Sequence, residues 1–110
     1  MSGSFEKRGK GFEAKWAHDE ELRFKVYARR NKLLGLWAAA EMGVSGVGAD
    51  AYAKEVVAAD FERPGEEDVF EKVRRDFDAR GTAVSDHMIR RQMEELLDSA
   101  KQQIETEGTH

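Results

Sequence analysis

The residue types best suited to catalysis stand side by side at Ser85-Asp86-His87. Serine, histidine and aspartate form hydrolytic triads, but a triad needs side chains that face one another across a site, which consecutive residues cannot do. A serine before an apolar run at helical spacing is instead typical of an N-cap, with Asp86 in the first turn. We therefore predict that this segment starts a helix, that the chain has no catalytic residue, and that the protein is not an enzyme.

Metal and cofactor binding find equally little support. His18, His87 and His110 are isolated, and no pair has the i,i+4 spacing of a metal site on a helix. The acidic runs Asp19-Glu20-Glu21 and Glu66-Glu67-Asp68 stand where helices are expected to begin, and the helix dipole accounts for them there. We predict no metal site and no cofactor.

A glycine-rich stretch, Gly43-x-x-Gly46-x-Gly48, precedes a predicted helix and is weakly similar to a phosphate-binding loop. It lacks the lysine and serine or threonine of a nucleotide-hydrolysing loop and does not follow a strand. We interpret residues 43–48 as a flexible linker in preference to a phosphate site.

The N-terminal segment combines aromatic and basic residues without any apolar stripe that could join a core. Residues 1–11 contain three glycines and should be mobile when free. Exposed aromatic residues are good anchors for a buried interface, although they could equally pack back on the domain. We predict a partner-binding arm over residues 1–18. Its candidate contact residues are Phe5, Lys7, Arg8, Lys10, Phe12, Lys15 and Trp16.

Composition limits what this arm could bind. The 110 residues suffice for one domain, and the net charge of −4 is divided unevenly: residues 1–42 carry +3 and residues 43–110 carry −7. The acidic body would repel phosphate, which argues against nucleic acid as a partner. No apolar run approaches the roughly 20 residues of a membrane span, so we expect no direct membrane insertion. The absence of cysteine fits a cytoplasmic protein, and we expect the free protein to be a monomer.

Four segments show apolar residues at helical spacing and no segment alternates like a strand. The first begins near Asp19, the second spans about residues 49–61, the third opens at Glu66 and closes at Arg80-Gly81, and the fourth follows Ser85. Their predicted inward residues are Leu22, Val26, Leu33, Leu36, Trp37 and Ala40; Ala49, Tyr52, Ala53, Val56 and Val57; Val69, Phe70, Val73 and Phe77; and Ile89, Met93, Leu96, Leu97, Ala100 and Ile104.

Four amphipathic helices with short links predict an all-α, four-helix bundle, because only mutual packing buries every stripe. The predicted organisation is an arm over residues 1–18, the bundle over 19–104 and a frayed C-terminus over 105–110.

Several blocks of the sequence, in this order, resemble the zeta subunit of the alpha-proteobacterial F-type ATP synthase, a natural inhibitor of its ATP hydrolysis. The blocks are Phe12-Glu13-x-Lys15-Trp16-Ala17-His18-Asp19-Glu20-Glu21-Leu22, Ala28-Arg29-Arg30-Asn31-Lys32-Leu33-Leu34-Gly35-Leu36-Trp37-Ala38, Tyr52-Ala53-Lys54-Glu55-Val56-Val57, Asp68-Val69, Lys72-Val73 and Ser85-Asp86-His87-x-Ile89-Arg90. The resemblance covers about residues 12–104.

This resemblance implies a four-helix bundle whose mobile N-terminal arm folds into a helix within the catalytic interface of the synthase head, reaches the rotor and blocks hydrolytic rotation. It implies a regulatory subunit peripheral to the bacterial inner membrane. Phe5 and Phe12 keep the family's seven-residue spacing, but Gly9 and Gly11 lie between them, where related arms favour helix.

Two alternatives remain open: a small helical adaptor for another protein, and a nucleotide-sensing bundle that binds ATP or ADP. The second would need phosphate contacts from Arg29, Arg30, Lys32 or the glycine linker.

Overall fold

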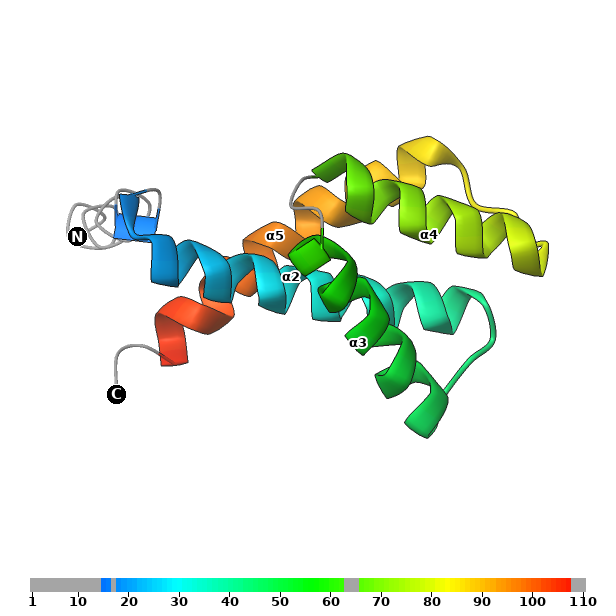
Figure 1. The fold of residues 1–110 in the computed structure, drawn as a ribbon, viewed down its shortest axis with the longest axis horizontal. Coiled ribbons are helices and arrows are strands. Elements are labelled where there is room, and N and C mark those ends of the chain that lie inside the picture. The colour runs from blue at the N-terminus through cyan, green and yellow to red at the C-terminus, as the bar shows by residue number, and fades with distance from the viewer. Residues whose placement is uncertain (1–14, 17, 63–65, 108–110) are drawn as a thin grey trace, which may run out of the picture.

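The structure, a computed structural model, describes residues 15–16, 18–62 and 66–107. It contains the helices α2 (Glu20–Glu41), α3 (Gly46–Glu62), α4 (Glu66–Arg80) and α5 (Asp86–Glu107), and no strand within these residues. α2 and α5 run antiparallel along the long axis, and α3 and α4 cover only the half of this pair that holds the end of α2 and the start of α5 (Figure 1). The predicted all-α, four-helix fold is confirmed.

The helix ends follow the signals in the sequence. The Asp19 carboxylate accepts a hydrogen bond from the Leu22 amide at 3.0 Å, and the Ser85 hydroxyl accepts one from the Met88 amide at 3.1 Å. α2 and α4 each end in a Schellman turn, whose left-handed positions are Gly43 (φ 76°) and Gly81 (φ 68°). The predicted Ser85 N-cap, the predicted start of α2 near Asp19 and the predicted end of α4 are confirmed.

Two helix boundaries differ from expectation. α3 begins at Gly46, three residues before the predicted start, so half of the predicted glycine linker is helical. Glycine lowers helix propensity without forbidding a helix, and packing against neighbours decides the outcome. α5 continues to Glu107, beyond the predicted end at Ile104, and residues 108–110 lie outside the described part of the chain.

The main core fills the space between the second half of α2, the start of α5, and helices α3 and α4. All four inward residues predicted for α4 are buried, and Val56, Ile89 and Met93 face them from α3 and α5. Trp37 lies at the edge of this core, half-buried, with its ring 5.7 Å from that of Phe77 in an edge-on arrangement. α3 is joined to α4 by Tyr52, whose hydroxyl donates to Asp76 at 2.8 Å; burial and this hydrogen bond raise the pKa of the phenol.

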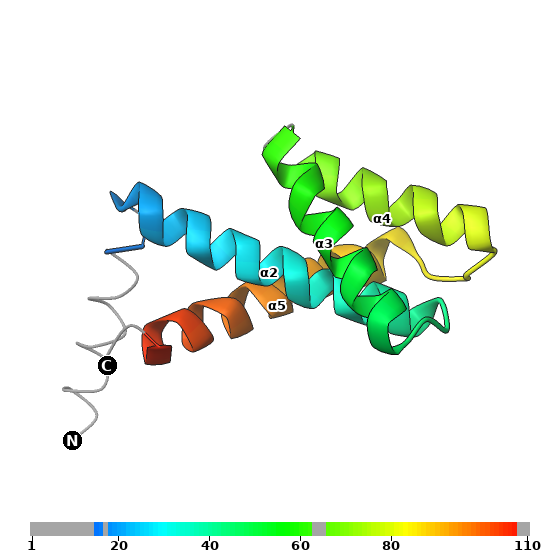
Figure 2. The same cartoon turned by 60° about the horizontal axis from the view of Figure 1, so that its bottom comes forward.

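A smaller core lies where α2 and α5 extend beyond the other two helices. Its buried residues are Val26, Ala100 and Ile104. Figures 1 and 2, which differ by a rotation of 60°, both show this region as a pair of helices without cover from α3 or α4. The beginning of α2 and the end of α5 therefore depend on each other for burial.

The buried face of α2 differs from the predicted one. Ala40 is exposed, and four of the predicted residues (Leu22, Leu33, Leu36 and Trp37) are only half-buried. The fully buried positions are Val26, Arg30, Asn31, Leu34, Gly35, Ala38 and Ala39. The helix contacts α3, α4 and α5, so it buries a broad surface instead of one narrow stripe. Because two polar residues and a glycine lie on that surface, the hydrophobicity pattern of the sequence does not reveal it.

Gly35 allows α2 and α3 to cross closely. A Cβ atom added to Gly35 would lie 2.6 Å from the Ala53 Cα and 3.2 Å from a Val56 methyl group. The nearest atom belongs to the backbone of α3, so no side-chain rotation could relieve the clash. A small residue at this crossing is therefore required by packing, despite its cost of about 1 kcal/mol in helix propensity.

We expect Gly35→Ala to lower the free energy of unfolding by about 1–2 kcal/mol. Overpacking typically costs about 1–3 kcal/mol, and the gain of about 1 kcal/mol in helix propensity offsets it only in part. Chemical denaturation measures the change. Gly48→Ala is the matched control, since its added Cβ meets only a side-chain methyl group of Val44. Equal effects of the two substitutions would contradict the close crossing.

Candidate partner-binding site

Of the seven predicted arm residues, five lie outside the described part of the chain: Phe5, Lys7, Arg8, Lys10 and Phe12. Lys15 and Trp16 are described, and both have helical backbone geometry. Lys15 is exposed, and its carbonyl accepts a hydrogen bond from the Asp19 amide at 3.0 Å. The structure therefore shows the base of the predicted arm, where it meets the bundle.

Asp19 separates this base from α2. Its backbone is extended (φ −105°, ψ 109°), while its side chain caps α2 and its carbonyl accepts a hydrogen bond from the Arg23 amide at 2.9 Å. An N-cap residue adopts non-helical backbone angles, so the residue that starts α2 also bends the chain. This bend lets Trp16 turn back on the bundle.

Trp16 packs between α2 and α5 over the smaller core. Its ring centroid lies 5.9 Å from that of Tyr27 on α2, and the Lys101 ammonium on α5 lies 4.3 Å from the ring centroid, within cation–π range. Of the two roles that the sequence leaves open for this aromatic residue, packing back on the bundle is the one that the free chain adopts. Sequence patterns gave no sign of Lys101, because it lies 85 positions from its partner.

The predicted nucleotide-contact residues do not form one site. The Arg29 guanidinium binds both carboxylate oxygens of Glu107 at 2.7 and 2.9 Å and donates to Gln103 at 2.7 Å. Hydrogen bonding to Glu107, opposed by burial, raises the pKa of Arg29. Lys32 is exposed, whereas Arg30 is buried inside the bundle. The two arginines are thus engaged by carboxylates, and nucleotide contact by the three residues stays a prediction.

Arg30 joins three helices from a position that is only 1% exposed. Its guanidinium donates to both oxygens of Glu66, at 2.7 and 3.2 Å, which fixes the start of α4 against α2. It also donates to the Met93 carbonyl of α5 at 3.5 Å and to the Asn31 side-chain oxygen at 2.8 Å, and it lies 5.3 Å from the Tyr27 ring centroid. The Asn31 amide nitrogen is buried and has no hydrogen-bond partner among the described residues. This cation is a structural element of the bundle.

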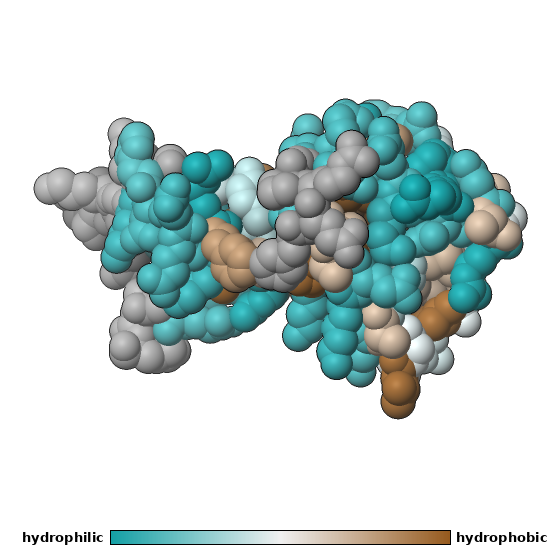
Figure 3. Space-filling model, viewed as in Figure 1, coloured by the Kyte–Doolittle hydropathy of each residue, from teal (hydrophilic) through white to brown (hydrophobic). Residues whose placement is uncertain are grey.

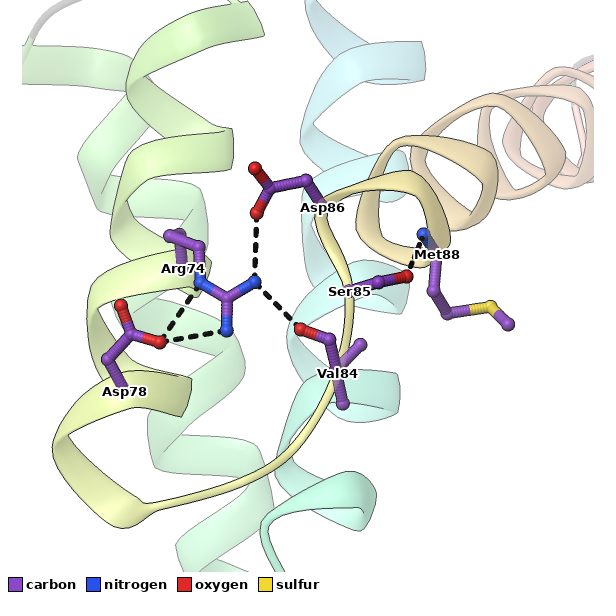
Figure 4. A network of polar contacts seen from close by, with 6 residues as sticks. All are labelled: Arg74, Asp78, Val84, Ser85, Asp86 and Met88. Carbon is purple, nitrogen blue, oxygen red and sulfur yellow. Dashed lines mark hydrogen bonds and ion pairs between the residues drawn. The ribbon is translucent and has the colours of Figure 1, made fainter.

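The start of α5, with Ser85, Asp86 and His87, lies against Arg74 of α4. Figure 4 shows the Arg74 guanidinium between Asp78, Asp86 and the Val84 carbonyl, and the Ser85 hydroxyl directed at the Met88 amide. The hydrogen bond to Asp86 raises the pKa of Arg74. His87 is exposed. The serine is therefore the predicted N-cap, and Asp86 ties the start of α5 to α4.

Within the described ranges, no three histidine, aspartate or glutamate side chains gather where they could hold a metal ion. None of the helices in that same part has the length and apolar character needed to cross a membrane. The face seen in Figure 3 is mostly hydrophilic, with hydrophobic atoms in small separate groups. Scattered apolar residues of this kind are normal for a protein surface.

The fold and this site define a small helical bundle whose described side chains serve capping, ion pairing and packing, with a basic segment joined to one end. Comparison with known families identifies the family of this chain. Residues 1–103 match the family described as ATPase inhibitor subunit zeta, and the chain belongs to that family. The resemblance of the sequence blocks is thereby confirmed.

A solved structure supports the fold. A protein determined by solution NMR is 48% identical to this chain and superposes with a TM-score of 0.70, covering 78% of this chain and 98% of its own. A search of curated proteins gave no match. The family describes a regulatory subunit of an ATPase and implies association with the F-type ATP synthase.

Proposed function

We propose that the protein inhibits ATP hydrolysis by the F-type ATP synthase through its N-terminal arm. In this proposal residues 1–18 insert as a helix at the catalytic interface of the synthase head, reach the rotor and block hydrolytic rotation. The protein would work in the cytoplasm, at the inner membrane only through the synthase. The observation that carries the proposal is the family match, which extends over the arm as well as the bundle.

The chemistry of the segment supports this role. Phe5 and Phe12 supply apolar anchors, and Lys7, Arg8 and Lys10 supply positive charge for an acidic or mixed surface. The described bundle has its own buried core, from Val26 onward, so we expect it to fold without these residues. A segment that orders on binding can cover a long surface while the folded domain holds its base.

The decisive measurement is a titration of the purified protein into the isolated synthase head while ATP hydrolysis is followed. We expect hydrolysis to fall in a saturable way. If hydrolysis is unchanged at saturating protein although binding to the head is confirmed separately, the result would contradict inhibition and favour the adaptor role. A nucleotide sensor would instead show residue-specific NMR shifts on addition of ATP without the synthase.

Replacing Gly9 and Gly11 together by alanine should tighten inhibition by roughly tenfold. Each glycine in a helix costs about 1 kcal/mol relative to alanine, and the two gains are not fully additive. The free arm should stay largely unfolded, because so short a helix is marginal alone. Inhibition curves measure the effect, with Gly48→Ala in α3 as the control. Unchanged or weaker inhibition would mean that the bound arm is not helical at these positions.

A further inference from the structure

We propose that Trp16 remains seated between α2 and α5 when the protein binds its partner, and that Lys101 is a positioning residue for the arm. The groups that Trp16 contacts, namely Tyr27, Lys101 and the smaller core, are called the Trp16 socket below. This inference rests on the proposed inhibitory function and narrows it: the part of the arm that inserts would end before Trp16, and the bundle would fix the arm at that residue.

The first support is the partial burial of the indole. Trp16 packs against the cluster of Val26, Ala100 and Ile104, which draws its residues from both helices. An aromatic side chain contributes a large apolar surface, so leaving this position would expose both the indole and the cluster beneath it. A partner would have to compensate that loss, whereas an arm anchored at Trp16 keeps these contacts.

The second support is the bend at Asp19. On a continuous helix, Trp16 and Tyr27 would be three turns apart, about 16 Å along the axis. Their ring centroids are instead 5.9 Å apart, which the extended backbone of Asp19 makes possible. The hydrogen bond from the Leu22 amide to the Asp19 carboxylate holds the cap that accompanies this bend. Seating of Trp16 and capping of α2 therefore favour the same chain path.

The third support is the spacing of the arm's aromatic residues. Phe5, Phe12 and Trp16 are separated by seven and four positions, which places all three on one face of a helix. If the bound arm is helical, fixing Trp16 fixes the rotation of the whole arm and the direction in which the two phenylalanines point. It also fixes their distance from the bundle, since each residue adds about 1.5 Å of helix. Such preorganisation lowers the entropy lost on binding.

Lys101 is the residue through which this idea can be tested. Its ammonium lies over the indole, yet it belongs to α5 and is far from the arm in the sequence. Tyr27 is less suitable, because its ring also contacts the buried Arg30. Trp16 itself is unsuitable as the only variant, because the arm could contact the partner through it.

We expect Lys101→Gln to weaken inhibition by about two- to fivefold, the equivalent of the 0.5–1 kcal/mol of an exposed cation–π contact. Lys101→Arg should restore inhibition, since a guanidinium also binds an aromatic face. Arg90→Gln is the matched control: it removes a cation 3.9 Å from the Phe70 ring at a site remote from the arm, and should leave inhibition unchanged. Thermal melting should be similar for all three variants.

The state of the socket in the complex is measured by spin labels, because the chain has no cysteine of its own. His18→Cys and Gln102→Cys place labels on exposed positions next to Trp16 and Lys101. Once the labelled protein is shown to inhibit like the wild type, the distance between labels should be the same with and without the synthase head.

A longer distance in the complex would overturn the proposal, and so would a Lys101→Gln variant that inhibits as well as or better than the wild type. In these cases the wild type still inhibits, so the proposed function survives. If the wild type does not inhibit, the proposed function is wrong, and the inference that rests on it is wrong as well. This outcome is distinguishable, because it appears in the wild type and not only in the variants.

Discussion

Removing residues 1–14 should abolish inhibition of ATP hydrolysis and leave the bundle folded. The deleted segment contains Phe5 and Phe12, and truncating one buried interface aromatic residue typically costs 2 kcal/mol or more. Loss of both should weaken inhibition by roughly several hundredfold. The deletion stops before Trp16 because that residue packs on the bundle, so the truncated protein retains both cores.

Two measurements separate the arm's function from a role in folding. Thermal melting followed by circular dichroism should remain cooperative, with a midpoint close to that of the intact chain. A protein of unchanged length, with residues 1–14 replaced by glycine and serine, controls for the presence of a tail and should also fail to inhibit. Retained inhibition in either variant would assign inhibition to the bundle, and loss of cooperative melting would place the arm in the core.

The sequence predicted α4 and α5 best, for a physical reason. Each of these helices buries one stripe, and each starts or ends at an unmistakable signal: Ser85 caps α5, and Gly81 adopts the left-handed conformation that closes α4. Local propensity, periodicity and burial agree in these segments. Where these levels agree, a pattern read from one chain is reliable.

The sequence predicted α2 poorly because this helix lies at the centre of the bundle. It contacts all three others, and its buried positions include Arg30 and Asn31 as well as Gly35. From the sequence alone, Arg30 is a candidate only for a phosphate contact in the nucleotide-sensing alternative. Burial of a cation depends on an acidic partner from another helix, here Glu66, and no single-segment pattern contains that information.

The base of the predicted arm shows the same limit. The sequence identifies Trp16 as an aromatic residue without a local stripe, and leaves open whether it anchors a partner or packs back on the bundle. Its return needs a bend at Asp19, a ring on α2 and a cation on α5. Of these features, the sequence predicts only the start of α2 near Asp19, since aspartate followed by two glutamates is a typical start of a helix.

Arg30→Ala should lower the free energy of unfolding by about 3 kcal/mol or more, a large share of the 5–15 kcal/mol that stabilises an ordinary domain. The substitution removes the bidentate ion pair with Glu66 and leaves a cavity between α2, α4 and α5. It also leaves the Asn31 oxygen without its donor, next to an amide nitrogen that already has no partner in the described part of the chain. An unsatisfied buried polar atom alone costs about 1–3 kcal/mol.

Denaturant unfolding of a short series tests whether this cost comes from the buried network. Arg30→Met keeps most of the volume and should cost less than Arg30→Ala, because only the polar contacts are lost. Lys25→Ala removes an ion pair whose side chains are 57% and 81% exposed, and should change stability by no more than about 0.5 kcal/mol. If Arg30→Ala proved as mild as Lys25→Ala, the guanidinium would not hold α4 against α2.

Arg30 also lies against Tyr27, which contacts Trp16. A marked loss of stability in Arg30→Ala should therefore also loosen the packing of Trp16. This is detectable as increased quenching of the Trp16 fluorescence in a Trp37→Phe background.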